Sequence, residues 1–410
     1  MEFYAVCSIF VMLGFVGYVL QFFAVHSAAR ESGKNCNMTD PVAGNFRPPV
    51  TILKPLKGLD DSLFDNLASF CQLDYPQYEI IFTLQDNNDP AFRIASKIRD
   101  KYSHLDITIH VERSAFGLNP KVNNLAPAYA RAKHPYVLIS DSNVLVERNY
   151  LTVIAQHMAD PGVGIVSNMI RGTGGRSWGA IFENLHLNSF IVGSVCMLDR
   201  ILKMPCVIGK SMLMRRTDLE AVGGLSAVRD VLAEDYVIGK RMHDAGKKVV
   251  LSTHLINNVN EFWSMKKFLN RHTRWGKLRW KIGGLRYVSE LIGNPVFVSC
   301  LPIVFWTANE ITVLTAALVG SMKILGDYLL ARSIDCDMKP SRYLLVPVKD
   351  FIIGCIWFIP LLSQTVIWRG NRYLIGKDSC LSPCSESAFG VFTQRLTQSL
   401  RDRLAWAWRE

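Results

Sequence analysis

The stretch Tyr136-Val137-Leu138-Ile139-Ser140-Asp141 decides the fold of this chain. Its first five residues form a short, mostly apolar and partly β-branched run, which is typical of a buried strand, and the run ends directly at an acid. A second run, residues 78–85, ends in the same way at Asp86. In open α/β sheets, ligands bind beyond the carboxyl ends of the strands. We therefore expect Asp86 and Asp141 at the ligand-binding edge of a sheet.

Outward from this stretch, short apolar runs alternate with longer segments of helical period. The segments are 50–54, 60–71, 78–85, 91–102, 107–111, 122–132 and 136–140. This alternation predicts an α/β domain with a mostly parallel sheet, which we place at residues 48–260. A less regular stretch follows up to about Pro205, then a strand at 207–214 and a helix at 234–245.

The chain is also expected to enter a membrane, because 49% of its 410 residues are hydrophobic and the mean hydropathy is +0.15. Residues 3–25 carry no charge. As a helix they would be about 34 Å long, enough for a hydrocarbon core of about 30 Å. We expect an anchor at 1–25 and a linker at 26–47. A cleaved signal peptide is the alternative, which Glu2 and the length of the run disfavour.

Basic residues follow this anchor, whereas only Glu2 precedes it, so the positive-inside rule predicts a catalytic domain on the cytosolic face. The corresponding membrane is the Golgi or ER if the source is eukaryotic and the inner membrane if it is bacterial. The ten cysteines show no CxxC pair, and a reducing compartment would leave them as thiols.

Three further apolar segments, 291–308, 311–331 and 351–368, lie within a hydrophobic region at 284–375. Three full crossings would place the basic tail at 376–410 outside, so we expect one segment to be re-entrant or interfacial. Pro347 and Pro360 indicate the third. The net charge of +11 gathers near membrane segments, at 266–286 and 395–409, and is interleaved with tryptophan. This pattern favours the lipid bilayer as a partner and disfavours nucleic acid.

Three groups of residues fit the chemistry of sugar transfer from a nucleotide donor. Asp141 at a strand end suits Mg²⁺ or Mn²⁺, although alone it would be read as a turn residue. Asp235, which opens a predicted helix, suits a general base or a charge favoured by the helix dipole. Arg271, Arg274 and Trp275 lie on an amphipathic helix at 261–283, where they suit either a diphosphate clamp or an interfacial anchor.

Six motifs in register extend this interpretation. They are Lys54-Pro55-Leu56-Lys57-Gly58, Leu73-Asp74-Tyr75-Pro76, Gln85-Asp86-Asn87-Asn88-Asp89-Pro90, Asn119-Pro120-Lys121-Val122-Asn123-Asn124-Leu125, Ala233-Glu234-Asp235-Tyr236 and Arg271-x-x-Arg274-Trp275. In these motifs the chain resembles the ceramide glucosyltransferase family, which includes bacterial hopanoid-associated glycosyltransferases. The resemblance covers residues 50–283 and implies a GT-A fold, a UDP-sugar donor, inversion at the anomeric carbon and a lipid acceptor.

By position, the resemblance implies that Asp235 is the catalytic base and that Asp141 binds the metal, Mg²⁺ or Mn²⁺. The donor-binding residues it implies are Lys54, Lys57, Asp86, Lys121, Arg271, Arg274 and Trp275. Asp141-Ser142-Asn143 lacks the second carboxylate of a D-x-D motif, and residues 185–204 align least.

The expected reaction is transfer from UDP-glucose to the primary hydroxyl of ceramide. A hopanoid acceptor with UDP-N-acetylglucosamine is the alternative within the same chemistry. An inactive lipid-binding scaffold is the alternative of another class, and a processive polysaccharide synthase is disfavoured by the short membrane part.

Overall fold

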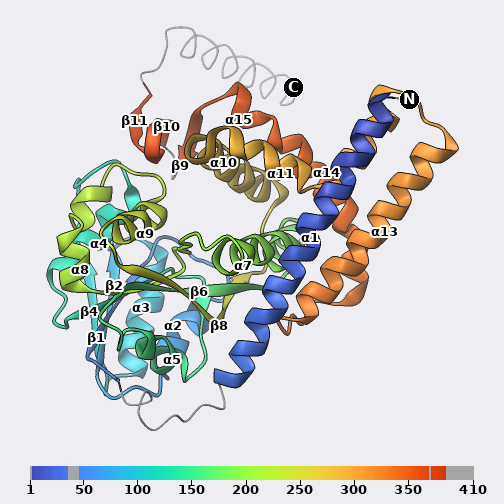
Figure 1. The fold of residues 1–410 in the computed structure, drawn as a ribbon. Helices are drawn as coiled ribbons and strands as arrows, with labels where there is room; N and C mark the ends of the chain where they lie inside the picture. The colour runs from blue at the N-terminus through green and yellow to red at the C-terminus, as the bar shows by residue number, and fades with distance from the viewer. Residues whose placement is uncertain (1, 36–45, 369–370, 385–410) are drawn as a thin grey trace, which may run out of the picture.

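A computed structural model describes residues 2–35, 46–368 and 371–384 (Figure 1). Its centre is an eight-stranded sheet of order β3-β2-β1-β4-β7-β6-β8-β5. The strands are β1 (Val50–Pro55), β2 (Tyr78–Leu84), β3 (Asp106–Val111), β4 (Tyr136–Ser140), β5 (Val144–Leu145), β6 (Val163–Gly174), β7 (Ser211–Arg215) and β8 (Lys248–Asn260). Four of the neighbouring pairs, β1 with β2, β1 with β4, β2 with β3, and β6 with β8, are parallel. The predicted α/β fold with a mostly parallel sheet is confirmed.

Helices cover both faces of this sheet, because the strands bury apolar side chains on both sides. One core gathers Ile52, Ile80 and Phe82 under one set of helices. These helices are α2 (Leu63–Phe70), α3 (Pro90–Lys101) and α5 (Tyr150–His157). The other core gathers Leu53 and Ile81 under α4 (Pro120–Ala130), α8 (Arg216–Ala221) and α9 (Glu234–Asp244). The neighbours Ile52 and Leu53 thus point to opposite faces, as strand geometry requires.

The stretch before Pro205, expected to be irregular, is helical instead. It forms α6 (Trp178–His186), a π-helical turn at Leu187–Ile191 and α7 (Val192–Arg200). Most of this helical stretch is buried, and it packs between the sheet and the long helix α1 (Glu2–Asn35). The asparagines and serines that suggested loops are buried here; Asn188, for example, exchanges hydrogen bonds with the backbone of Gly172.

Four helical stretches of the described residues are long and apolar enough to cross a membrane. They are Phe3–Glu31, Trp178–Arg200, Glu310–Arg332 and Pro340–Leu362. A fifth span results if Met265–Ile292 and Pro295–Phe305, which are bent by 73° at a break, are counted as one. The predicted apolar helices at both ends of the domain are confirmed, and the chain is a membrane protein.

Several boundaries differ from those expected. Helix α1 continues to Asn35, into the expected linker, because no proline interrupts residues 26–35. The segment 291–308 contains the end of α11 (Val288–Ile292) and the whole of α12 (Pro295–Phe305), and the next helix is α13 (Glu310–Arg332). The expected third membrane segment contains α14 (Val346–Trp357) and α15 (Ile359–Leu362) and then turns into a strand.

That strand, β9 (Thr365–Trp368), pairs with β10 (Asn371–Ile375), which pairs with β11 (Leu381–Pro383). The small sheet returns to the α/β domain, where the Leu381 N–H donates to the Asp230 carbonyl over 2.7 Å. Its β-branched and aromatic residues favour a strand over a membrane helix. Residues 385–410 of the expected basic tail lie outside the described residues.

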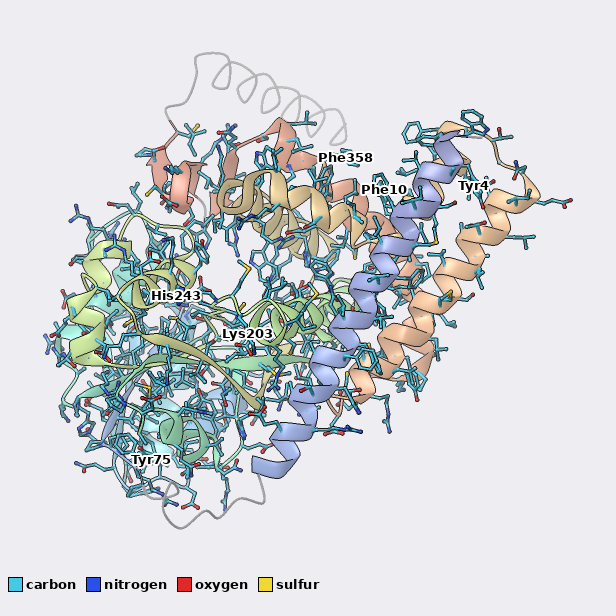
Figure 2. All side chains as sticks on the ribbon, in the orientation of Figure 1. Tyr4, Phe10, Tyr75, Lys203, His243 and Phe358 are labelled. Carbon is cyan, nitrogen blue, oxygen red and sulfur yellow. The ribbon has the colours of Figure 1, made fainter. Side chains whose placement is uncertain are left out.

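The apolar surface of the molecule lies on the long helices. In Figure 1, α1 (blue) and α13 (orange) run side by side, away from the α/β domain. Figure 2 places Tyr4 and Phe10 on α1, at the end remote from Tyr75 in the α/β domain. Exposed apolar side chains recur along both helices, for example Leu13 and Leu314. Such a surface fits a lipid environment.

Candidate active site

A cavity of about 540 Å³ opens where β4 ends, α9 begins and α10 (Met265–Gly283) passes over the domain. It is lined by six of the predicted site residues, namely Lys121, Asp141, Asp235, Arg271, Arg274 and Trp275. These residues lie up to 154 positions apart in the chain. The fold therefore brings the strand-end acid, the helix-opening acid and the basic helix into one place.

Lys121 connects the acids of this cavity. Its ammonium group lies 2.9 Å from Asp141 Oδ1 and 2.9 Å from Glu234 Oε1, and it donates to the Gly209 carbonyl over 3.2 Å. Asn119 fixes the start of the same helix by accepting from the Lys121 N–H, and its amide donates to Glu234 Oε2. Lys121 is thus held by three protein acceptors between β4 and α9.

Asp235 has the environment of a general base. Its Oδ2 accepts from the Gly209 N–H over 2.9 Å and its Oδ1 accepts from the Tyr236 N–H over 2.8 Å. Burial, together with the charge of Glu234, raises the pKa of Asp235 to about 6. The carboxylate remains ionised at neutral pH and binds a proton more readily than an ordinary aspartate does.

Helix α10 presents Arg271, Arg274, Trp275 and Leu278 to the cavity. Their spacing of three and four residues places them on one face of the helix. Ser264 caps the helix by accepting from the Lys267 N–H. The expected amphipathic helix thus begins four residues later than predicted, since residues 261–264 lead into its cap.

The Arg271 guanidinium lies against two tryptophan rings and beside Glu183. Its central carbon lies 4.2 Å from the Trp275 ring centre and 5.0 Å from that of Trp263. Its Nε lies 3.3 Å from Glu183 Oε1. Arginine suits such a position because its planar group stacks on rings and donates along its edge. Arg271 also lines the cavity.

Glu183 was missed in the sequence, although it contacts both Arg271 and His272. It lies on α6 with no exposed surface, and its second oxygen is 2.9 Å from His272 Nε2. The sequence did indicate that Glu183 is unusual, because it is the only acid between Trp178 and Leu198. A charge in an apolar helix is costly unless it is paired or functional.

Lys210 was missed as well. Its ammonium lies 3.0 Å from Asp141 Oδ2 and donates to Asn143 Oδ1 over 2.6 Å. Burial acts to raise the pKa of Asp141, but Lys121 and Lys210 outweigh it, so the pKa lies well below its usual range. Asp141 is a permanent anion with a cation at each oxygen.

This arrangement does not fit the expected Mg²⁺ or Mn²⁺ at Asp141. Both carboxylate oxygens and the amide oxygen of Asn143 are taken by lysine ammonium groups. The part of the chain that the structure describes contains no group of three or more His, Cys, Asp or Glu arranged to hold a metal ion. The metal at Asp141 therefore stays a prediction.

Lys54 lies beneath the cavity rather than in it. Its side chain is fully buried, with the ammonium 3.6 Å from the centre of the Phe70 ring, and it donates to the Asp141 carbonyl over 2.7 Å. A side chain without exposed surface does not reach a ligand. The structure thus replaces the expected donor contact of Lys54 by support for the backbone of Asp141.

Lys57 and Asp86 line a second cavity of about 540 Å³, together with Arg113. Pro55 lines the first cavity and Leu56 the second, so the two flank the same short stretch of chain. The predicted donor-binding residues are therefore divided between two cavities.

Comparison with known proteins identifies the family. The sequence model of glycosyl transferase family 21 matches residues 9–381. The chain belongs to glycosyl transferase family 21. The resemblance drawn from the six motifs is confirmed, and the α/β domain with its apolar helices is the GT-A arrangement that the resemblance implied. Membership makes the chain a glycosyltransferase.

Two relatives of the chain come from Caenorhabditis elegans. Ceramide glucosyltransferase 3 is 26% identical over 380 residues, which are 90% of this chain and 81% of the relative. Ceramide glucosyltransferase 1 is 27% identical over 339 residues, which are 80% and 71%. Among solved structures, the chain is similar to a mannosyltransferase from Pyrobaculum calidifontis in complex with GDP-Man and Mn²⁺, with 15% sequence identity and a TM-score of 0.46. The match covers 86% of this chain and 98% of the mannosyltransferase chain.

Proposed function

We propose that this glycosyltransferase moves glucose from UDP-glucose to the primary hydroxyl of ceramide, with inversion at the anomeric carbon. The observation that carries the proposal is the single cavity in which Asp235 faces the Arg271 and Arg274 helix. A base for a hydroxyl and a clamp for a diphosphate are the two groups that this reaction needs. The names of the two Caenorhabditis elegans relatives support glucose and ceramide.

The nucleoside of the donor occupies the second cavity, where Asp86 and Lys57 contact it. Its diphosphate then extends past Pro55 into the first cavity, toward Arg271 and Arg274. Guanidinium groups bind phosphate oxygens through two parallel hydrogen bonds. Trp275 stacks on Arg271 and keeps its plane fixed for this contact.

The reaction itself needs one base and one leaving group. The acceptor oxygen forms a bond to the anomeric carbon while the bond between that carbon and the UDP oxygen breaks. The proton of the hydroxyl passes to Asp235, and UDP leaves as an anion. Arg271 and Arg274 stabilise the charge that develops on the diphosphate.

The acceptor reaches the cavity along its apolar wall, to which Ile191, Val207, Ile208 and Leu278 contribute. Ile191 ends the π-helical turn, and the following helix α7 packs on α1. This wall therefore leads from the base toward the membrane helices. The lipid tails remain in the bilayer, which avoids exposing them to water at about 0.8 kcal/mol per CH₂ group.

We infer that the α/β domain lies on the cytosolic face, since Arg30 and Lys34 follow the apolar part of α1. Its membrane is the Golgi or ER in a eukaryote and the inner membrane in a bacterium.

The test offers the purified full-length protein two lipids, ceramide and a hopanoid polyol, each with UDP-glucose or UDP-N-acetylglucosamine. Mass spectrometry identifies the product. Glucosylceramide is the expected result, whereas an aminosugar hopanoid would replace both substrates. UDP binding without any glycolipid would favour the lipid-binding scaffold.

A further inference from the structure

The ammonium group of Lys210 lies between the first and third side chains of Asp141-Ser142-Asn143. It is 3.0 Å from Asp141 Oδ2 and 2.6 Å from Asn143 Oδ1. The Lys210 side chain is only 15% exposed, and it lines the cavity that also holds Asp235. These contacts hold the ammonium group at the floor of the candidate active site.

In a D-x-D segment, a cation can be bound by the oxygens of the first and third side chains. The Lys210 ammonium group occupies the equivalent position in this chain. In this chain the third residue, Asn143, supplies a neutral oxygen, so the segment has one anionic ligand fewer for a divalent cation. A lysine ammonium is a compact positive charge with three donors. Two of them serve Asp141 and Asn143, which leaves the third for a ligand in the cavity.

Lys121 differs from Lys210 in this respect. The acceptors around its ammonium group are Asp141 Oδ1, Glu234 Oε1 and the Gly209 carbonyl. Three acceptors match the three donors of an ammonium group. All three donors of Lys121 are therefore used by acceptors within the protein, whereas Lys210 has a donor left to bind a ligand.

The charges that line the cavity agree with this division. They comprise five basic side chains, Lys121, Lys210, Lys267, Arg271 and Arg274, and four carboxylates, Asp60, Asp141, Glu234 and Asp235. Basic groups outnumber carboxylates by one in the lining, and the buried Glu183 behind Arg271 balances this excess. The basic side chains of the lining are the groups that a nucleoside diphosphate would meet.

We propose that Lys210 is a diphosphate-binding residue that takes the place of a divalent cation and makes donor binding largely independent of Mg²⁺ or Mn²⁺. The proposal rests on the proposed function, because it assumes a nucleoside diphosphate donor. It makes Lys210 a binding residue for the donor, while the base remains Asp235.

The experiment measures the affinity of the purified full-length protein for UDP by calorimetry, in chelator and in Mn²⁺. For the wild type we expect the two dissociation constants to agree within about threefold. Lys210→Met should weaken UDP binding in chelator by about 10- to 100-fold, the loss of one charge-assisted hydrogen bond. Mn²⁺ should restore part of this loss, because the substitution frees oxygens of Asp141 and Asn143.

Two further variants separate binding from folding. Lys210→Arg keeps the charge and should keep the chelator-resistant binding, whereas Lys240→Met, an exposed lysine on α9, should change neither constant. Wild-type binding that disappears in chelator and returns with Mn²⁺ would overturn the proposal. If UDP fails to bind under any condition, the proposed function would be overturned as well. Chelator-resistant UDP binding without sugar transfer would support the role of Lys210 in donor binding and would contradict only the proposed donor sugar and acceptor lipid.

Discussion

Replacing Glu183 by glutamine tests whether the clamp depends on a residue outside the cavity. Glu183 does not line the active-site cavity, yet its carboxylate holds the Nε edge of Arg271 and the ring of His272. Glutamine keeps the size of the side chain and removes its charge. The change therefore removes the partner of Arg271 while leaving α6 packed.

The expected loss follows from the burial of this pair. Glu183 has no exposed surface and the Arg271 side chain is 11% exposed, so solvent screens their interaction little. The two groups form a charge pair at 3.3 Å without a hydrogen bond between Nε and Oε1. A close charge pair shielded from solvent contributes about 1.5 kcal/mol or more. If that energy orients Arg271 toward the leaving group, kcat/KM should fall by about 10- to 100-fold.

The assay follows sugar transfer under steady-state conditions and UDP affinity by calorimetry. The loss should appear in kcat, because Arg271 acts on charge that develops in the transition state. Glu112→Gln, an exposed glutamate after β3, is the matched control and should leave both quantities unchanged. A folded Glu183→Gln variant with kcat/KM within twofold of the wild type would refute the reasoning.

Four other predictions concern the base and its surroundings. Asp235→Asn should lower kcat by at least about 10³-fold with UDP affinity retained. In the wild type, kcat/KM should rise with pH through about 6 as Asp235 ionises and should then level off. A rise centred near pH 4 would instead show that Asp235 titrates as an ordinary aspartate. Gly209→Ala should lower kcat by about 10-fold or more, since the added Cβ would lie 2.6 Å from Asp235 Oδ2; full activity would show that the base tolerates displacement. Asn119→Ala should lower the free energy of unfolding by about 1–2 kcal/mol, as chemical denaturation would measure, because it removes the cap of α4; an unchanged midpoint would exclude that role.

The sequence predicts the α/β domain well because its strands are short apolar runs that end at turn residues or acids. The family resemblance of the motifs implied that Asp141, Asp235 and Arg271 share a site, and the fold places all three around one cavity. Asp86 lines the second cavity and not the first. This separation of Asp86 from the other site residues depends on how the chain turns after β1.

Other contacts could not be predicted, because they join segments with no local relation. Glu183 meets Arg271 only after α6 and α10 pack together, and Lys210 meets Asp141 only after β7 pairs with β4. Lys54 illustrates the opposite error: its motif suggested a ligand contact, whereas its position in a central strand buries it. Strand β9 was missed because residues 351–368 are apolar enough to resemble a membrane helix.

The most direct measurement of the central claim is the anomeric configuration of the glycolipid made by purified wild-type and Asp235→Asn proteins from UDP-glucose and ceramide. Nuclear magnetic resonance of the product should show β-glucosylceramide from the wild type, because the donor is α-linked and one displacement inverts it, and the variant should form almost none. An α-linked product, or equal turnover by the variant, would contradict Asp235 as the base of an inverting transfer.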